Sequence, residues 1–199
     1  MNFSLGGNTY KWIIDPLLSG AQKIIIKAVE PTDRVVDIAC GTGSLSMAMA
    51  LVSLDVKGID LSEDMIKFAS ENADKKKISN VSFSAMDASD LTSFNKEEFS
   101  VAVTSMSIHQ FDPQLAIQIL KEMKRIAGKL ILMDYTYPLK RGFTRSVVYS
   151  IEWLAGGDHW KNFRKYNKLG GLEYYLREAG LDIKKELYRS SAFRVLVCE

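Results

Sequence analysis

The chain has 199 residues, of which 47% are hydrophobic and 25% are charged, a composition typical of a soluble globular protein. Its formal net charge of +2 at pH 7 is too small to indicate a nucleic acid or an anionic membrane surface as partner. No apolar run approaches the roughly 18 residues that a membrane span needs, and the N-terminus has no signal-peptide pattern. Cys40 and Cys198 lie far apart in the sequence and form no metal-type cluster. We therefore expect one domain over residues 1–199 and a reducing, cytoplasmic location.

Helices and strands are predicted to alternate along the first two thirds of the chain. In chain order we expect a helix at 17–29, a strand at 34–39, a helix at 45–51 and a strand at 56–60. A helix capped by Ser62 and ending near residue 77 follows, then strands at 81–85 and 99–105, a helix from Asp112-Pro113 to about residue 128, and a strand at 130–135. Such alternation with short connections is typical of a mainly parallel sheet with helices on both faces.

The region 138–171 interrupts this alternation. It contains a predicted helix at 144–154, a Gly156-Gly157 turn and a basic-aromatic stretch at 160–166. A long insertion between a core strand and the next core helix is more typical of a lid than of a simple loop. Beyond it we expect a core helix at 172–179 and a terminal antiparallel pair of strands at 182–188 and 192–198.

A glycine-containing loop follows the first strand, at Gly41-Thr42-Gly43. Glycines between a strand and a helix let the backbone turn sharply and approach a ligand closely. The N-terminus of the following helix adds unpaired N–H groups. The same spacing also occurs in ordinary turns, so its context decides its meaning.

Three acidic residues stand at or near the ends of three successive strands. Asp37 suits a cationic ligand group and would repel a pyrophosphate. Asp60, 19 residues after Gly41, can accept hydrogen bonds from ribose hydroxyls, and Asp87 can accept one from an exocyclic adenine amine while Met86 packs on the ring. Each could instead be a structural turn or capping aspartate. Together they indicate a ligand site, because ligands bind at the carboxyl edge of parallel sheets.

This arrangement resembles the class I S-adenosylmethionine (SAM)-dependent methyltransferases. Residues 35–43 are similar to the first motif of that family, 56–65 to its second, 85–88 to its third and 99–109 to its fourth. The likeness is strongest over residues 33–135, and the nearest subgroup holds the ubiquinone/menaquinone C-methyltransferases and many small-molecule methyltransferases. It implies an α/β, Rossmann-like fold with a mainly parallel seven-stranded sheet and an antiparallel terminal strand. It also implies methyl transfer from SAM to a small molecule by direct SN2 displacement, which leaves S-adenosylhomocysteine.

The resemblance also implies residue roles. Asp37 and the Gly41 region would hold the methionine part of the cofactor, Asp60 the ribose and Asp87 the adenine, with Ser105 near the reacting methyl. Ala39 replaces the usual first glycine of the motif, and Ser100 stands where many relatives carry Asp. The full set of expected cofactor residues is Asp37, Ala39, Gly41, Gly43, Asp60, Leu61, Met65, Met86, Asp87, Ala88, Ser105 and Tyr10.

Two residues have open roles. His109 follows the fourth strand and is either a catalytic base, since histidine is the usual near-neutral base, or a brace for its loop. Tyr10 either closes over the cofactor or clamps the sheet.

Aromatic and basic residues gather in or beside the insertion. The aromatic rings would hold an apolar or ring-bearing acceptor or form a small core of their own; they are Tyr135, Tyr137, Trp153, His159, Trp160, Phe163 and Tyr166. The basic residues would meet an anionic substrate or form a solvated face; they are Arg141, Arg145, Lys161, Arg164 and Lys165. The sequence indicates neither an oligomeric state nor an acceptor atom.

Two other functions use similar residues. An NAD(P)-linked oxidoreductase is disfavoured by Asp37 and by Ser46, which stands where the dinucleotide fingerprint needs a third small residue. A SAM-binding module without catalysis would keep the same cofactor residues, although the intact motifs and full-length insertion favour an enzyme.

Overall fold

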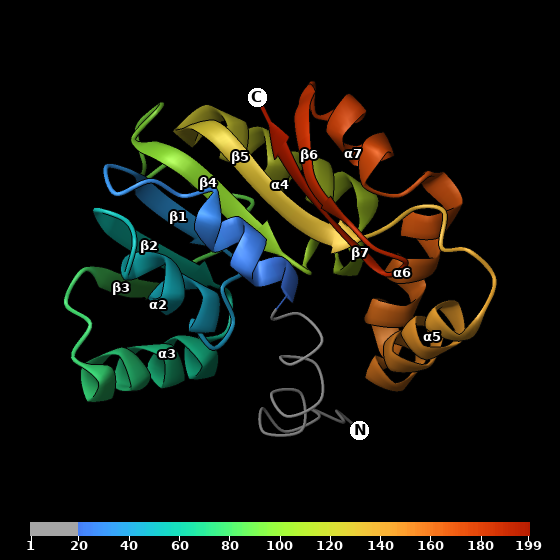
Figure 1. Ribbon diagram of the computed structural model, residues 1–199, viewed down its shortest axis with the longest axis horizontal. Helices are drawn as coiled ribbons and strands as arrows, with labels where there is room; N and C mark the ends of the chain where they lie inside the picture. Colours follow the sequence, from blue (N-terminus) through green and yellow to red (C-terminus); the bar gives the residue numbers. More distant parts are fainter. Residues whose placement is uncertain (1–19) are drawn as a thin grey trace.

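A seven-stranded sheet forms the centre of the computed structural model, which describes residues 20–199 (Figure 1). Its strand order is β3-β2-β1-β4-β5-β7-β6. The strands are β1 (Arg34–Ile38), β2 (Asp55–Asp60), β3 (Val81–Ala85), β4 (Phe99–Ser105), β5 (Ala127–Tyr135), β6 (Ile183–Arg189) and β7 (Phe193–Cys198). The first five pair in parallel, and β7 runs antiparallel between β5 and β6. The predicted α/β fold with its terminal antiparallel pair is confirmed.

The central strands are buried because their sequences are apolar on both faces. In β1, Val35, Val36 and Ile38 are fully buried, and β4 buries Val101 and Val103 in the same way. Continuous apolar runs of this kind are typical of parallel strands covered by helices on both sides. The strand order changes direction between β1 and β4, and the crevice at such a switch point is the usual ligand site of open α/β sheets.

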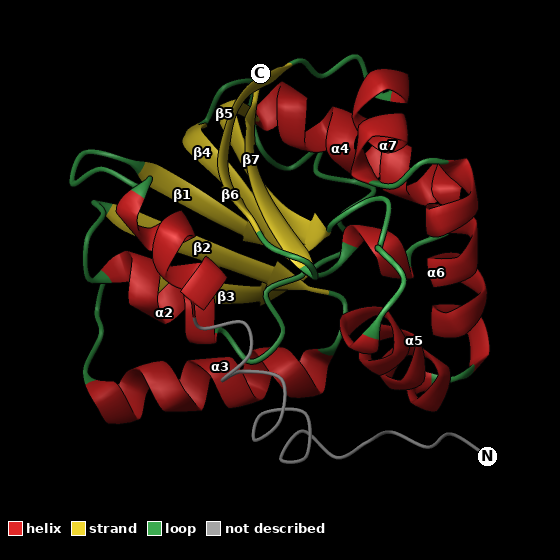
Figure 2. Cartoon of the chain, turned by 45° about the vertical axis from the view of Figure 1, so that its right-hand side comes forward, coloured by secondary structure: helices red, strands yellow, loops and turns green. Residues whose placement is uncertain are grey.

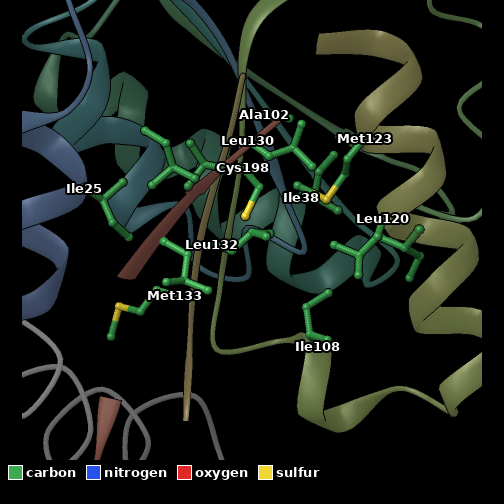
Figure 3. Close-up of a cluster of buried hydrophobic side chains, with 14 of the residues drawn as sticks. Ile25, Ile38, Ala102, Ile108, Leu120, Met123, Leu130, Leu132, Met133 and Cys198 are labelled. Carbon is green, nitrogen blue, oxygen red and sulfur yellow. The ribbon is translucent and has the colours of Figure 1, made fainter. Parts of the chain in front are cut away.

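Helices cover both faces of the sheet (Figure 2). Residues 20–27, α2 (Ser44–Ala50) and α3 (Glu63–Lys76) lie on one face, and α4 (Pro113–Ile126) and α7 (Leu172–Glu178) on the other. Figure 3 shows this layering in the core, where Ile25 of the first helix and Leu120 of α4 approach the sheet from opposite sides.

The observed helix ends have local causes. The Ser62 hydroxyl accepts a hydrogen bond from the Met65 N–H at the start of α3, and the Asp112 carboxylate caps α4 ahead of Pro113; both caps satisfy N–H groups that lack a partner in the helix. Helix α4 ends at Ile126, earlier than predicted, because β5 begins at the next residue. Residues 17–19 of the predicted first helix lie outside the described residues.

The insertion folds as two helices, α5 (Phe143–Ala155) and α6 (Gly157–Leu169). Both lie beyond the carboxyl ends of the strands (Figures 1 and 2). Helix α6 packs against the short helix η1 (Ile108–Gln110) and against α5. Gly156 ends α5 with φ +69°, as predicted for a turn. The stretch that follows was predicted only as basic and aromatic, yet it is helical and buries Phe163 and Tyr166 on one face.

Within residues 20–199, no helix combines the length and the apolar character that crossing a membrane requires. The same residues contain no cluster of three or more His, Cys, Asp or Glu side chains arranged to hold a metal ion.

Candidate active site

A cavity of about 520 Å³ opens at the carboxyl ends of β1 to β4, within the size range of small-molecule sites. Nearly all of the predicted cofactor residues line it: Asp37, Ala39, Gly41, Asp60, Leu61, Met65, Met86, Asp87, Ala88 and Ser105. Two predicted cofactor residues are not found in the wall of this cavity. Gly43 is not among the lining residues, and Tyr10 lies outside the described residues.

The two glycines of the loop have different roles, although both have positive φ values. Gly41 (φ +53°) faces open space, because a Cβ built on it meets no atom within 4 Å. A Cβ on Gly43 (φ +71°) would lie 2.6 Å from the Phe83 ring and 2.8 Å from the Ala69 Cβ. Gly41 therefore exposes its backbone to the cavity, whereas Gly43 lets the loop pack against β3 and α3. The part of Gly43 in cofactor binding stays a prediction.

Ala39 begins this loop and ends β1 one residue earlier than predicted. Its φ of +57° places a residue with a Cβ in the left-handed region, which costs roughly 1–2 kcal/mol. Alanine in place of the usual glycine therefore adds only a small side chain, but its backbone conformation is unfavourable. Such strain is typical of functional sites whose surroundings hold the backbone in place.

Asp60 connects the first loop to the end of β2. Its Oδ2 accepts a hydrogen bond from the Gly41 N–H at 2.8 Å, and its Oδ1 accepts one from the Ser62 N–H at 2.9 Å. Each carboxylate oxygen has further acceptor capacity. The carboxylate is thus held at the cavity wall with lone pairs available to hydroxyl donors.

Asp37 is a buried acid that no cation pairs with in the described part of the chain. The Ser46 hydroxyl donates a hydrogen bond to its Oδ2 at 2.5 Å. Burial raises the pKa of Asp37 to about 7, the Ser46 hydrogen bond opposes this rise, and the nearby charge of Asp60 adds to it. A positively charged ligand group beside Asp37 would favour its ionised form.

Asp87 lies two residues beyond β3. Its Oδ1 accepts both hydrogen bonds found for this carboxylate in residues 20–199, from the Ser89 N–H at 2.8 Å and the Ser89 hydroxyl at 2.7 Å. Its Oδ2 accepts none from the described residues. The three predicted acids therefore do meet at one sheet edge and one cavity.

His109 is buried beneath this edge and does not line the cavity. Its Nδ1 lies 2.6 Å from Oδ1 of Asp134 on β5, and its Nε2 lies 3.4 Å from Oε1 of Glu152 on α5. The Tyr135 hydroxyl donates to the same Glu152 oxygen at 2.8 Å. We call Asp134, His109, Glu152 and Tyr135 the buried network.

The charge state of His109 follows from this network. Burial alone lowers the pKa of His109, but the carboxylates of Asp134 and Glu152 outweigh it and raise the pKa to about 10. Burial likewise opposes ionisation of Glu152, and His109 and Tyr135 outweigh it, so the pKa of Glu152 is lowered. The imidazole is therefore a cation between two anions at neutral pH.

The aromatic residues of the insertion mostly pack on one another. Tyr135, Phe163 and Tyr166 are buried, Phe163 contacts the rings of Tyr135 and Trp160, and Trp153 is 64% exposed. Of the aromatic set expected to hold an acceptor, His159 alone lines the cavity among the described residues. For Tyr135, Phe163, Tyr166 and Trp160, the alternative prediction of a small core is the better one. The exposed Trp153 fits neither prediction.

The basic residues of the insertion lie away from this cavity. Lys161, Arg164 and Lys165 border a separate hollow of about 610 Å³ beside Tyr149 and Trp160. Lys165 forms an ion pair of 2.6 Å with Asp112. These cations therefore face outward and do not contribute to the cavity at the strand ends.

Comparison with known proteins identifies the family. The sequence profile of the family described as "Methyltransferase domain" matches residues 30–189, which include every helix and strand from β1 to β6 and leave out β7. The chain belongs to this methyltransferase family.

Curated relatives of this chain include two named "Ubiquinone biosynthesis O-methyltransferase". The protein from Pseudomonas syringae pv. tomato is 30% identical over 155 residues, covering 76% of this chain and 65% of the relative. The protein from Methylococcus capsulatus is 28% identical over 155 residues, covering 75% of this chain and 63% of the relative. The matched region thus spans slightly less than two thirds of the length of these relatives.

Solved structures share the fold of this chain. The PH0226 protein from Pyrococcus horikoshii superposes with a TM-score of 0.71 at 20% identity, over 98% of this chain and 99% of its own. A structure described as a SAM dependent methyltransferase from Aquifex aeolicus superposes with a TM-score of 0.67 at 18% identity, over 96% of both chains. At these identities the likeness establishes the fold.

Several lining residues of the strand-end cavity were missed in the sequence analysis. Met106, Ser107, Gln110 and Phe111 directly follow β4, so the rule that ligands bind at strand ends would have found them. The others belong to the helices and loops around the first three strands and α4: Gln22, Cys40, Thr42, Ser44, Leu45, Ser62, Leu115 and Ile119. The helical spacing of Leu115 and Ile119 indicates a buried face but not that it borders a cavity.

Proposed function

We propose that this methyltransferase transfers a methyl group from SAM to a small-molecule acceptor at the cavity of the strand ends. The observation that carries the proposal is the placement of Asp60. Its carboxylate is fixed by the Gly41 and Ser62 N–H groups and keeps acceptor capacity toward the cavity, which suits the two hydroxyls of a ribose.

The other residues of the cavity fit SAM by their chemistry. Gly41 leaves open space where a side chain would otherwise project, so its backbone can approach the methionine carboxylate. Asp37 is a buried acid without a cation in residues 20–199, and the methionine amino group would supply one. The Oδ2 atom of Asp87 would accept from the adenine amine, with Leu61, Met65, Met86 and Ala88 around the ring. Gly43 would support this site from the core side, through its packing on Phe83.

When bound, SAM supplies a methyl group that its sulfonium charge activates. The chain's part is to hold the acceptor in line with that methyl group and to exclude water. Ser105 lies at the end of β4 and lines the cavity, where it would border the reacting centre. Direct SN2 displacement needs a base only when the acceptor must lose a proton.

His109 would not act as that base. A general base needs a free lone pair within reach of the proton, and His109 is a buried cation whose ring atoms face Asp134 and Glu152. We propose that His109 is a positioning residue, which fixes η1 and α5 relative to β5.

We further propose that residues 1–199 form one methyltransferase domain in which α5 and α6 act as a lid. Support comes from the packing of α6 against η1 and α5 and from two hydrogen bonds of α6. The Asn162 side chain donates to the Gln110 carbonyl oxygen at 2.8 Å, and the Tyr166 hydroxyl donates to the Tyr135 carbonyl oxygen at 3.0 Å. The free thiols of Cys40 and Cys198 support the expected cytoplasmic location.

The NAD(P)-linked alternative is disfavoured by the same geometry. A pyrophosphate on the Gly41 loop would come close to the carboxylate of Asp37, and Ser46 carries a hydroxyl bonded to that carboxylate instead of the small residue that a dinucleotide needs. A binding module without catalysis would differ in turnover and not in cofactor affinity.

The test has two steps on the full chain. Calorimetry should detect binding of SAM and S-adenosylhomocysteine, and binding of NAD without SAM would contradict the proposal. Incubation with SAM labelled on its methyl group and a pool of small metabolites should then transfer label to an acceptor. Cofactor binding without transfer to any acceptor, including phenols, amines and thiols, would favour the binding module.

A further inference from the structure

The chain contains two histidines, and their surroundings differ. His109 is buried, and both of its ring nitrogens face carboxylates of the buried network. His159 lines the cavity together with Ser105, Ser107 and Gln110. Its imidazole makes no hydrogen bond and no ion pair with any residue in the range 20–199. His109 is thus paired with two buried carboxylates, whereas the ring of His159 lines the proposed site without a hydrogen bond or ion pair to residues 20–199.

The backbone that carries His159 is fixed at the strand ends. His159 is the third residue of α6, directly after the turn at Gly156. Further along the same helix, Asn162 and Tyr166 are hydrogen-bonded to backbone carbonyl groups of Gln110 and Tyr135, and Phe163 is fully buried. The helix therefore holds the His159 side chain at the cavity through its own packing.

The electrostatic surroundings favour a neutral ring. Desolvation by the surrounding protein lowers the pKa of His159, the carboxylate of Glu152 on α5 opposes this, and the positive charge of His109 on η1 lowers it further, so that the pKa lies below its usual range. On its own helix the charged neighbours are Asp158 and Lys161. At pH 7 one ring nitrogen therefore carries a lone pair that can accept a proton.

We propose that His159 is a catalytic residue that contacts the methyl acceptor and removes a proton from a weakly acidic, phenol-like hydroxyl. The proposal rests on the proposed function, since it names the acceptor class and the base for the same cavity.

The step balances without any further reactant. The hydroxyl proton moves to the free ring nitrogen of His159 as the oxygen attacks the methyl carbon of the sulfonium donor. The carbon–oxygen bond forms while the carbon–sulfur bond breaks, and its electron pair stays on sulfur as a neutral thioether. The imidazolium of His159 then gives its proton to water, because the ring is open to solvent through the cavity.

The chemistry of the base selects the acceptor class. A neutral amine already carries a nucleophilic lone pair and needs no base before attack, and an aliphatic alcohol is far too weak an acid for an imidazole. A phenolic hydroxyl must lose its proton, unlike an amine, and is more acidic than an aliphatic alcohol. For such a group a base of near-neutral pKa is most effective. Met106 and Phe111 share the cavity and give it apolar walls for a ring. The curated relatives named above are O-methyltransferases by name, which agrees with an oxygen acceptor.

The first experiment compares His159→Gln with Lys168→Met, a matched change of an exposed residue at the far end of α6. With phenol as acceptor and SAM as donor, His159→Gln should lower kcat/KM by about 10²–10⁴-fold, and Lys168→Met should leave it unchanged. The loss should be smaller with 4-nitrophenol, which is more acidic and needs less help from a base. The acid limb of the wild-type pH profile should disappear in His159→Gln. An equal loss with both phenols would overturn the proposal.

Two further measurements do not depend on turnover. In ¹³C-histidine NMR spectra the chain gives two Cε1–H signals, and the one that His159→Gln removes should titrate with a midpoint below 6.5. A midpoint at or above 7 would contradict a neutral base. With S-adenosylhomocysteine present, the wild-type protein should bind 4-nitrophenol as its coloured anion at a pH where the free phenol is neutral, and His159→Gln should lose this colour.

The outcomes separate this proposal from the proposed function. If S-adenosylhomocysteine does not bind, the proposed function fails. If it binds and methyl transfer to a phenol proceeds equally fast in His159→Gln and wild type, the proposed function stands and the role of His159 is wrong. Unchanged melting temperatures of both variants would show that the comparison concerns chemistry and not folding.

Discussion

The two sides of the cavity are built in different ways. On the side of β1 and β2, backbone N–H groups and tight turns hold Asp60 and shape the Gly41 loop. On the side of α5 and α6, buried side chains hold the helices, with His109 charged between Asp134 and Glu152. A site made by the backbone depends on a few residue types at fixed spacing. A site held by side-chain packing depends on partners that lie far apart in the sequence.

The largest expected effect comes from a substitution on the α5 and α6 side of the cavity, which buried side chains hold together. His109→Ala leaves Asp134 and Glu152 as buried carboxylates without their cation, and breaking a buried charge network in this way costs about 3–5 kcal/mol. Urea denaturation should show this loss in the free energy of unfolding. The matched control is His159→Ala, which removes an exposed histidine and should change stability by less than about 0.5 kcal/mol. Equal effects of the two substitutions would contradict the contrast between them.

The same network makes stability depend on pH. The pKa of His109 is raised from its ordinary value of 6.5 to about 10 in the folded chain. Folding therefore binds a proton, and the resulting stability is fully present below pH 6.5 and is lost as the pH rises through 10. Denaturation curves between pH 6 and pH 10 should show this decline, and His109→Gln should flatten it.

The next largest effect distinguishes Gly43 from Gly41 on the β1 and β2 side of the cavity, by the stability that each loses on substitution. Gly43→Ala forces a Cβ against Phe83 and Ala69 in a left-handed conformation, and should destabilise the fold by about 2–4 kcal/mol. Gly41→Ala meets open space and should cost only the conformational strain of about 1–2 kcal/mol. Thermal melts of the pair test the difference, and a larger loss in Gly41→Ala would overturn the assignment of Gly43 to the core.

Asp37 gives a smaller, pH-dependent effect. Because burial raises its pKa to about 7, binding of a cationic amino group should release a proton from Asp37 at pH 6. The affinity for SAM should rise by roughly tenfold between pH 6 and pH 8, since each pKa unit corresponds to a tenfold change. Calorimetry in two buffers of different ionisation enthalpy would measure the released proton, and Asp37→Asn should abolish the release.

The smallest effect concerns the surface of the insertion. Lys165 and Asp112 form an exposed ion pair between α6 and the start of α4, and such pairs contribute at most about 1 kcal/mol. Lys165→Met should therefore leave the melting temperature almost unchanged. A loss comparable to that of His109→Ala would mean that surface charge, and not the buried contacts of Asn162, Phe163 and Tyr166, holds α6.

These contrasts explain what the sequence could and could not predict. The sequence predicted β1, the glycine loop after it and the three acids Asp37, Asp60 and Asp87, because these features depend on short spacings. The structure brings all three acids to one cavity. The partners of His109 could not be predicted, because Asp134 and Glu152 become neighbours only when β5 and α5 pack together. The cavity position of His159 depends on the path of α6 in the same way.

Helix α6 is a different case, because its sequence does contain a helical signal. Trp160, Phe163 and Tyr166 recur at a spacing of three and pack along one side of the insertion. The two glycines before them predict a turn, and the basic residues between them predict a solvated stretch. The glycines in fact separate two helices, and the basic residues form the outer face of the second.

Calorimetry of S-adenosylhomocysteine binding to Asp60→Asn and Asp55→Asn tests the central claim most directly. Both residues lie at the ends of β2, Asp60 at the cavity and Asp55 at the opposite end in a surface ion pair with Arg34. The account predicts that Asp60→Asn weakens binding roughly 100-fold, because hydrogen bonds to a charged group contribute about 1.5–3 kcal/mol each, while Asp55→Asn binds as the wild type does. Equal affinity of the two variants would show that the cofactor does not bind at the strand-end cavity.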